Sequence, residues 1–406
     1  MDHITYVERA MAQAERSGDW QRVVAAQIET ARRRAGDRPQ ARPERDGRGN
    51  ARKRKDDPMS MLLTIDDLKQ QARRRVPKMF FDYADSGSWT ESTYRANEED
   101  FGKIKLRQRV LVDMDNRSLA STMIGCVDAG GVAPTGSTGM QHADGEMLAA
   151  QAAEEFGVPF TLSTMSICSI EDVASVTKKP FWFQLYVMRD KDFVLNLIDR
   201  AKAAKCSALV LTLDLQILAQ RHKDLRNGLS APPKMTLPNI IDMAIRPGWC
   251  LGMLRTKRRT FRNIAGHAKG VGDLSSLISW THEQFDPRLS WADVEWIRQR
   301  WGGKLILKGI LDKEDAILAA RPAPTPSSFP TMAAGSSMAP HPPSPSWKRS
   351  SMPSATRSRP FLYGLGAAGK AGVTQALEII RKELDMTLAL CGKRDIKDAS
   401  RDMLHR

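Results

Sequence analysis

Between residues 321 and 358 this chain carries no pattern from which a strand or a helix can be predicted. Pro, Ser, Ala, Arg and Met follow one another without a usable period, and ten prolines lie between Pro322 and Pro360. Proline has no amide hydrogen and a fixed φ, so neither a central strand nor a helix interior can run through most of this stretch. The sequence alternates strands and helices up to Ala320, and globular patterning resumes at Phe361. Any fold that the chain adopts is therefore interrupted before its last helix.

Short apolar runs alternate with apolar residues at helical spacing through the globular part. The strands expected from this pattern are Val132–Pro134, Phe160–Ser163, Phe181–Val187, Leu209–Leu213 and Lys304–Leu307. Capping boxes are expected at Thr64 and Ser290, and helix ends at Gly157 and Gly392. Repeated βα units of this length predict a parallel sheet, most simply a (β/α)8 TIM barrel, whose chemistry lies in the loops after the strands.

The two ends of the chain differ from this globular part. We expect residues 1–58 to be an extension with two short helices and a charged Pro/Gly/Arg linker, disordered in part because it has nothing to bury. The barrel is expected over residues 59–396, interrupted at 321–358, with a tail at 397–406. The net charge of +15 suits nucleic acid and anionic lipid equally. No aromatic residues interleave the arginines of the extension, so a solvated arm, or translation begun upstream of the natural start, is favoured over a nucleic-acid partner.

Cysteine usage and hydropathy narrow the class of protein further. The five cysteines form no close pairs, which indicates a reducing compartment and argues against a disulfide framework or a zinc site. No apolar run approaches the ~20 residues that span a bilayer, and no hydrophobic signal segment stands at the start.

Polar side chains stand at the ends of the expected strands, where a packed core excludes them. They are Gln184, Tyr186, Thr212, Asp214 and Lys308. Lysine is rarely fully buried without a partner, so Lys308 at a barrel mouth favours an anionic ligand. Arg221 lies just beyond Asp214 and could hold a carboxylate with its guanidinium fork, although beside His222 and Lys223 it could equally be a solvated loop arginine.

Four segments of this sequence resemble the FMN-dependent α-hydroxy-acid dehydrogenase family. They are PKMFFDYADSG at Pro77–Gly87, APTG at Ala133–Gly136, FQLY at Phe183–Tyr186 and LKG at Leu307–Gly309. The resemblance is closest to the bacterial L-lactate dehydrogenase branch and covers roughly residues 62–320 and 359–396. It implies a barrel that carries FMN at the carboxyl ends of its strands. The implied reaction is the oxidation of L-lactate, a 2-hydroxy acid, to pyruvate, with electrons passed to a quinone or cytochrome of the respiratory chain.

The same resemblance implies which residues bind the flavin. They are Ala133, Pro134, Thr135, Ser163, Gln184, Thr212, Lys308 and Arg359. The first three would offer backbone groups to the ring, and the next three would hydrogen-bond its polar edge. Lys308 would lie near the ring atoms that become negative on reduction. Arg359 is what remains of the family's phosphate site.

Substrate and catalytic roles follow from the resemblance in the same way. Tyr83 and Arg221 would bind the substrate carboxylate, and Tyr186 would hydrogen-bond the substrate hydroxyl. Asp214 would orient and stabilise a cationic histidine that acts as the base.

That histidine is missing from this sequence. The family carries Ser-Asn-His-Gly-Gly-Arg-Gln-Leu-Asp-Gly after its sixth strand, and Pro330–Ala339 here reads Pro-Thr-Met-Ala-Ala-Gly-Ser-Ser-Met-Ala. The codons TCC AAC CAT GGC GGC CGG CAG CTC GAT GGC encode the family peptide. Read one base later, the same string encodes the peptide found here at all ten positions. We infer a frameshift near Arg321, with the frame restored just before Arg359 and a deletion that removed the family's Asp-Gly-Gly-Ile-Arg phosphate stretch.

Two outcomes of this defect are weighed. The barrel is expected to be incomplete, with strands 6 to 8 disrupted, which leaves open parallel edges. The chain is thus either a working FMN-dependent lactate dehydrogenase whose reading frame was misrecorded, or a catalytically dead, poorly folded remnant of one. Loss of a positioned base alone costs roughly 10²–10⁴-fold in rate.

Residues 237–262 combine apolar and aromatic side chains with a cationic cluster. This composition suits docking on an anionic membrane surface, and membrane-associated members of the family carry a segment at this place. The alternative is a mobile loop packed on its own barrel. We therefore expect a peripheral protein on the cytoplasmic side of a bacterial inner membrane, or a cytoplasmic one, and a homo-oligomer without nucleic-acid partners.

Overall fold

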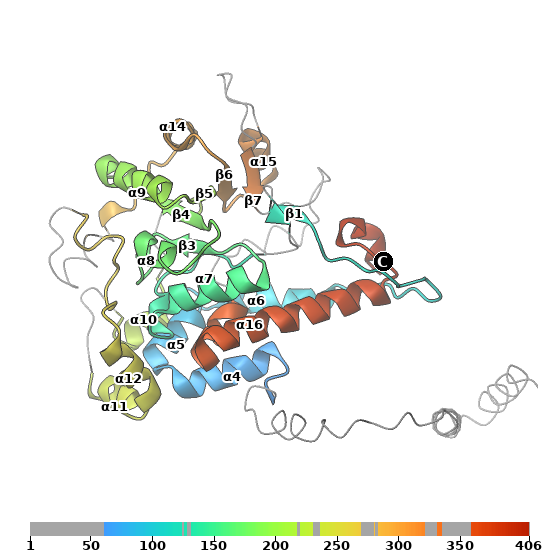
Figure 1. The fold of residues 1–406 in the computed structure, drawn as a ribbon, viewed down its shortest axis with the longest axis horizontal. Helices are drawn as coiled ribbons and strands as arrows, with labels where there is room; N and C mark the ends of the chain where they lie inside the picture. The colour runs from blue at the N-terminus through green and yellow to red at the C-terminus, as the bar shows by residue number, and fades with distance from the viewer. Residues whose placement is uncertain are drawn as a thin grey trace, which may run out of the picture. The chain divides into compact units, whose positions relative to one another are not determined.

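A five-stranded parallel sheet forms the centre of the protein (Figure 1). The computed structural model describes residues 61–123, 126–127, 131–216, 220–229, 236–268, 280, 283–320, 331–334 and 359–405. The sheet has the order β3-β4-β5-β6-β7. Its strands are β3 (Thr161–Ser163), β4 (Trp182–Tyr186), β5 (Ala208–Thr212), β6 (Leu305–Lys308) and β7 (Thr331–Ala334). Val132 adds a parallel bridge to Phe160 beside β3.

Helices follow the strands and bury them. They are α7 (Gly145–Phe156), α8 (Ile170–Ala174), α9 (Lys191–Ala203), α14 (Trp291–Trp301) and α15 (Lys313–Ala319). β3 and β5 are buried along their whole length, and β4 and β6 except at their last residues, as expected for parallel strands covered on both faces. Leu185, Leu209 and Leu307 pack in one cluster with Leu197 of α9 and Ile297 of α14.

The capping signals read from the sequence are confirmed. Thr64 caps α4 (Ile65–Arg75) and Ser290 caps α14, each in a capping box with the Asp three residues on. Gly157 ends α7 with φ at 93°, a left-handed conformation that glycine adopts without steric cost.

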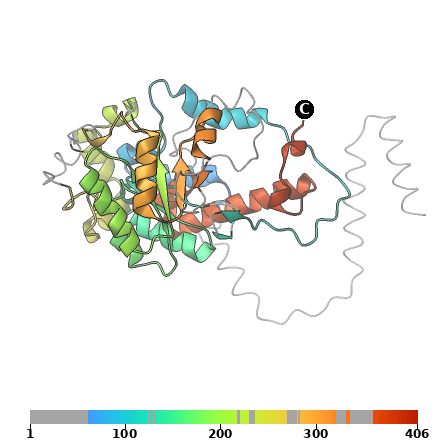
Figure 2. The same ribbon diagram turned by 90° about the horizontal axis from the view of Figure 1, so that it is seen from above.

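The N-terminal and C-terminal helices pack together beside the sheet. α16 (Arg359–Leu390) contacts α4 and α7, and α5 (Lys78–Ala84) and α6 (Ser92–Glu99) complete this layer. In both views the C-terminal half of α16 extends beyond the sheet (Figures 1 and 2). There the 3-10 helices η5 (Ile396–Asp398) and η6 (Arg401–Met403) fold back, and the chain hydrogen-bonds from Arg107 N to Met403 O at 2.7 Å.

Over the residues that the structure describes, the sheet does not close into a ring. The expected barrel is present as β3 to β6 with their helices, and β7 is the described part of residues 321–358. The predicted extension at 1–58 lies outside the described residues. A short antiparallel ribbon of β1 (Thr122–Met123) and β2 (Cys126–Val127) precedes the sheet.

Between β5 and the crossover helix α14, the described residues include three further helices. They are α10 (His222–Arg226), α11 (Leu237–Ala244) and α12 (Pro247–Arg255). Six apolar side chains on α11, α12 and Ile245 between them are exposed: Leu237, Ile240, Ile241, Ile245, Leu251 and Leu254. No helix in the described parts of the chain is both long and apolar enough to cross a membrane.

Two glycines on either side of a kink let α16 fold against itself. The helix departs from helical φ/ψ at Ala368 and Gly369, and a Cβ on Gly364 would lie 2.3 Å from the carbonyl oxygen of Gly372. Gly364→Ala should therefore lower the unfolding free energy by about 1–3 kcal/mol through overpacking, although alanine favours helices. Urea denaturation measures the change.

The matched control is Gly248→Ala in α12, where an added Cβ meets no atom within 4 Å. This variant should be as stable as the parent chain or slightly more so. Equal losses in the two variants would show that the close approach of Gly364 and Gly372 does not limit stability.

Candidate active site

A buried row of polar side chains crosses three strands at the carboxyl edge of the sheet. Ser163 Oγ donates to Gln184 Oε1 at 3.0 Å, and Gln184 Nε2 donates to Thr212 Oγ1 at 3.0 Å. The parallel register sets Ser163 beside Gln184 and Tyr186 beside Thr212. All three members of the row are at most 4% exposed. Three residues proposed from the sequence as flavin ligands are thus brought together, with their donors and acceptors fixed by one another.

Lys308 and Asp214 form an ion pair at the end of the same edge. Lys308 is the register partner of Thr212, and its Nζ lies 3.5 Å from Asp214 Oδ1. The next residue, Gly309, has φ at 100°, and a Cβ there would lie 2.6 Å from Asp214. Only glycine fits between the two chain segments, so the Lys-Gly pair of the motif places the charge beside the carboxylate.

Tyr186 and Tyr83 lie close to this ion pair. Burial, together with nearby Tyr83 and Asp214, raises the pKa of Tyr186, so its hydroxyl stays protonated at neutral pH. The Tyr186 ring packs edge-on against Phe285 with centroids 5.5 Å apart. A Cβ on Gly136 would lie 3.4 Å from the Tyr83 hydroxyl, which puts this hydroxyl beside the loop at 133–136.

Arg221 contacts Tyr83 from the other side. Its Cζ lies 4.6 Å from the centroid of the Tyr83 ring, a cation–π distance, and Nη2 donates to the Tyr83 carbonyl oxygen and to Ser86 Oγ. Its Nε lies 3.1 Å from Asp224 Oδ2. The guanidinium is therefore held by the protein on several sides, and it positions Tyr83 as well as offering positive charge.

The loop at Ala133–Thr135 supplies an unsatisfied polar atom. It follows the bridge at Val132, and Thr135 accepts at its carbonyl oxygen from Thr138 Oγ1 at 2.9 Å. The Thr135 hydroxyl is buried and has no hydrogen-bond partner. Buried polar groups are nearly always paired, so this orphaned hydroxyl fits a ligand that the polar edge of a flavin ring could supply.

Arg359 contacts residues of α6 and lies 3.9 Å from Asp85. Its guanidinium carbon is 4.2 Å from the Tyr94 ring centroid, and Nη1 is 2.8 Å from Glu98 Oε1. The side chain is 4% exposed. The residues at the ring edge fit a flavin, whereas Arg359, placed in this way, offers no comparable fit for the phosphate end.

Asp85 connects the substrate-side loop to three helices. Its Oδ1 accepts from the hydroxyls of Tyr363 at 2.6 Å and Tyr94 at 2.7 Å, and it pairs with Lys69 at 3.0 Å. Burial opposes ionisation of this carboxyl, but the hydrogen bonds and the lysine outweigh it and lower its pKa. Because Asp85 lies two residues after Tyr83, this network fixes the position of Tyr83.

No histidine takes the place of the missing base in the part of the chain that the structure describes. The polar contact of Asp214 there is with Lys308. His142 contacts Ala143 O through Nδ1 at 2.8 Å and packs against Gly369. It therefore belongs to the helix layer.

A covered parallel sheet with a polar row and a lysine at its carboxyl edge defines a cofactor-binding α/β enzyme of the barrel type. The sequence matches the FMN-dependent dehydrogenase family over residues 72–322 and 355–406, and the chain belongs to this family. The family's cofactor is FMN. Residues 323–354, which the family does not match, fall within the predicted break.

The alignments with individual relatives extend over nearly the whole length of each relative. The chain is 36% identical to an L-lactate dehydrogenase of Actinobacillus pleuropneumoniae over 85% of this chain and 98% of the relative. It is also 36% identical to an L-lactate dehydrogenase of Xanthobacter autotrophicus, with 85% and 97% covered. The structure resembles that of the monotopic membrane protein (S)-mandelate dehydrogenase with a TM-score of 0.72 and 27% identity, over 85% of this chain and 99% of the other.

Sequence reasoning missed Asp85, Ser86 and Asp224. The first two lie inside the Pro77–Gly87 motif, which was the available signal. No sequence signal pointed to Asp224, because its role depends on a neighbour that only the fold brings close. Burial raises the pKa of Asp224 to about 6; the charge of Arg221 lowers this pKa and that of Asp82 raises it.

The pKa of Asp224 predicts a pH-dependent stability. The folded protein holds this proton more tightly than the unfolded chain, whose value is 3.8. Ionised Asp224 therefore opposes folding above about pH 6, and the penalty disappears as the pH falls to 4. At about 1.4 kcal/mol per pH unit the full penalty is up to about 3 kcal/mol. Asp224→Asn should gain stability relative to the parent as pH rises from 4 to 7 in urea unfolding.

Glu171→Gln provides a control of opposite sign. Its hydrogen bond with Arg200 lowers the pKa of Glu171 to about 2. The ionised carboxyl therefore contributes stability above about pH 4 that is lost on further acidification, so this variant should lose stability relative to the parent as pH rises from 2 to 5. Parallel stability curves for Asp224→Asn and the parent would contradict the assignment.

Proposed function

We propose that this chain is built for the FMN-dependent oxidation of L-lactate to pyruvate. The observation that carries the proposal is the buried Ser163, Gln184 and Thr212 row, continued by Lys308, at the carboxyl edge of the sheet. The named L-lactate dehydrogenases that share 36% of its residues support lactate as the substrate. The acceptor that we propose is a quinone or cytochrome of the respiratory chain.

The residues divide the work between the cofactor and the substrate. FMN supplies the chemistry that accepts the electrons of the substrate C–H bond. Ser163, Gln184 and Thr212 would hydrogen-bond the ring edge, the orphaned Thr135 hydroxyl would complete that set, and Lys308 would stabilise negative charge on the ring. The backbone groups of Ala133 and Pro134 line the ring in this proposal.

The substrate is held by the other residues at this edge. Tyr83 and Arg221 bind the carboxylate, and the protonated Tyr186 hydrogen-bonds the hydroxyl oxygen. Asp214 would orient a neutral base and stabilise the cation that forms when this base takes the hydroxyl proton. In this chain the partner of Asp214 is Lys308, and a base is lacking there among the described residues.

We further propose that the 406-residue chain as written does not turn over, because a frameshift replaced the segment that bears the base. In the frame that begins one base earlier, the first two bases of each codon of this chain become the second and third bases of the codon at the same position. A middle T encodes only Phe, Leu, Ile, Met or Val. The quoted string gives Ser336 as AGC and Ser337 as TCG; with TCN codons at the other serines, middle T falls at residues 327, 328 and 329, at 337, and again at 344, 346, 347, 350, 351, 354 and 358.

The shifted frame therefore restores a strand and a helix. Three consecutive apolar residues are typical of a buried strand, and the positions 347, 350, 351 and 354 have the i, i+3, i+4, i+7 spacing of an amphipathic helix. Every CCN proline codon becomes NCC, which encodes Ser, Pro, Thr or Ala. Met332 becomes NAT, which encodes Tyr, His, Asn or Asp, and histidine is the base that the family motif requires.

Two measurements test the proposed defect. Sequencing of the coding DNA across codons 315–362 should show a one-base shift near codon 321 and a deletion before codon 359. The purified chain should be colourless and should not reduce a dye with L-lactate above background, since the base alone is worth roughly 10²–10⁴-fold. A yellow preparation of this same chain that reduces the dye would overturn the proposal, and continuous, intact DNA would make the defect a sequencing error.

We propose a second property, peripheral docking on an anionic membrane through α11 and α12. Their six exposed apolar residues stand beside the exposed cations Arg255, Lys257 and Arg259. Apolar side chains that enter the lipid interface next to cations that meet anionic headgroups are typical of such docking. The (S)-mandelate dehydrogenase that the structure resembles is itself a monotopic membrane protein.

Co-sedimentation with vesicles tests the docking. The full chain should bind phosphatidylglycerol vesicles better than phosphatidylcholine vesicles, and high salt should weaken the binding. Ile240→Asp combined with Leu254→Asp should lower the affinity at least tenfold, because each buried side chain contributes about 1.5–3 kcal/mol. Ile317→Asp in α15, which is 52% exposed, is the control and should bind as the parent does. Equal binding by the double variant would exclude this surface.

We place the protein, on this basis, at the cytoplasmic face of a bacterial inner membrane. The homo-oligomer expected from the sequence stays a prediction, and sedimentation velocity tests it.

A further inference from the structure

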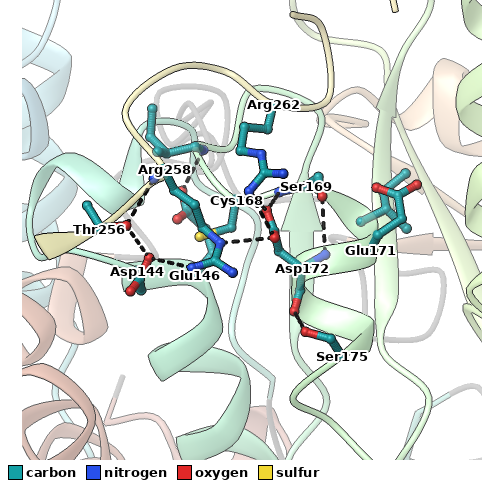
Figure 3. Close-up of polar contacts among 12 residues, drawn as sticks. Asp144, Glu146, Cys168, Ser169, Glu171, Asp172, Ser175, Thr256, Arg258 and Arg262 are labelled. Carbon is teal, nitrogen blue, oxygen red and sulfur yellow. Dashed lines mark hydrogen bonds and ion pairs between the residues drawn. The ribbon is translucent and has the colours of Figure 1, made fainter. Parts of the chain in front are cut away.

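The segment that follows the docking helices is bound to the barrel by a compact polar cluster (Figure 3). We call α11 and α12 with their connection, Leu237–Arg255, the docking hairpin, and Thr256–Asn263 the clamp segment. The hairpin is also held at its inner face, where Trp249 Nε1 donates to Met140 O at 2.9 Å and the Trp249 ring stacks on Phe80. Its apolar outer face carries no part of this attachment.

Arg258 bridges two carboxylates that belong to two different helices. Its Nη1 lies 3.1 Å from Asp144 Oδ1, and its Nε lies 2.9 Å from Asp172 Oδ1. Thr256, which is buried, donates to the same Asp144 oxygen at 2.6 Å, and Arg262 Nη1 reaches Asp172 at 3.1 Å. A guanidinium presents its donors in a planar fork, so one arginine can join two carboxylates that a lysine ammonium on its flexible stem would not bridge in the same geometry.

Both carboxylates belong to residues at helix starts, and that of Asp172 is fixed there by a capping box. Asp144 stands at the N-cap position of α7. Asp172 forms the capping box of α8, where its Oδ2 accepts from Ser169 N at 2.8 Å and its N–H donates to Ser169 Oγ. The clamp segment therefore contacts α7, which follows Val132 and the flavin-side loop, and α8, which follows β3 with Ser163.

Asn263 continues the attachment to the polar row. It is fully buried, and its Nδ2 donates to Ser166 Oγ at 2.9 Å and to Ser163 O at 3.3 Å. Its Oδ1 accepts from Ile170 N at 3.0 Å, and its carbonyl oxygen accepts from Arg200 Nη1 at 3.1 Å. A continuous set of hydrogen bonds thus leads from the end of the docking hairpin to the residue that begins the Ser163, Gln184 and Thr212 row.

We propose that Arg258 is a positioning residue that couples the docking hairpin rigidly to the flavin-side edge of the sheet. An anionic lipid surface that binds the hairpin then restrains the Ser163–Asp172 segment, and this edge is held in a fixed orientation to the membrane. The inference rests on the proposed membrane docking and adds to it a defined mechanical link. Coupling of this kind is reciprocal, so what orders one end should order the other.

Hydrogen exchange of the full chain, followed by mass spectrometry, tests the link without requiring activity. Arg258→Gln should speed amide exchange in α12 and the clamp segment at least tenfold, and Arg258→Lys should give an intermediate increase. Arg259→Gln is the matched control. It removes the same charge one residue away, but among the described residues Arg259 hydrogen-bonds to the carbonyl oxygens of Thr256 and Leu254, so exchange outside its own turn should not change.

Equal exchange in Arg258→Gln and the parent would overturn the proposal, and so would an equally large effect of Arg259→Gln. Unchanged exchange in α4 and α9 shows that the variant has folded. If Arg258→Gln does not fold, Arg258→Lys, which retains the charge, decides the question by the same comparison.

Phosphatidylglycerol vesicles supply the second arm of the experiment. In the parent they should slow exchange in the docking hairpin and also in Ser163–Asp172. In Arg258→Gln the slowing should be confined to the hairpin, and persistence at Ser163–Asp172 would overturn the coupling. A parent chain that binds no vesicles would refute the membrane part and the docking proposal together, whereas the vesicle-free comparison would still show whether Arg258 holds the hairpin.

Discussion

The parallel register of β3 to β6 is the constraint on which the rest of the structure depends. It sets Ser163 beside Gln184, and Tyr186, Thr212 and Lys308 in one row, so that side chains far apart in the sequence meet at a single edge. A shift of one strand by one residue would turn its polar side chains to the opposite face of the sheet. These side chains would then lose their hydrogen-bond partners on the neighbouring strands. The buried hydrogen bonds of the row in turn oppose such a slip, because an unpaired donor or acceptor in this position costs about 1–3 kcal/mol.

The same constraint explains why the unmatched stretch at 323–354 bears on the whole sheet. A parallel sheet takes its next strand only after a crossover helix, and α15 is in place to deliver one. The stretch that follows is rich in proline, which cannot donate to a ladder. Thr331–Ala334 within this stretch still pair with β6 as β7, but the residues that follow do not carry the family's histidine, whereas the first half of the site, which β3 to β5 build, keeps its geometry.

The surface of the protein is organised around the same edge. The exposed apolar residues of α11 and α12 lie on a segment inserted after β5, and its return path is bound to the starts of α7 and α8 through Arg258 and Asn263. Insertion at this point places an exposed apolar surface and the flavin-side loops on neighbouring segments. An enzyme that passes electrons to an acceptor at a membrane would gain from a short and fixed separation between the two.

The sequence by itself determined the elements and the chemistry they carry: the capping boxes at Thr64 and Ser290, the buried strands and the polar residues at their ends follow from local spacing and backbone preference. It also located the break, since proline acts on its own residue and its neighbours. Only the tertiary structure decided the partners of the charged groups. Arg221 bonds to Tyr83 across 138 residues, Tyr363 to Asp85 across 278, and Arg359 turns to Tyr94 and Glu98. Such partners depend on which segments pack together and on how much water that packing excludes. Neither can be read from local spacing along the sequence.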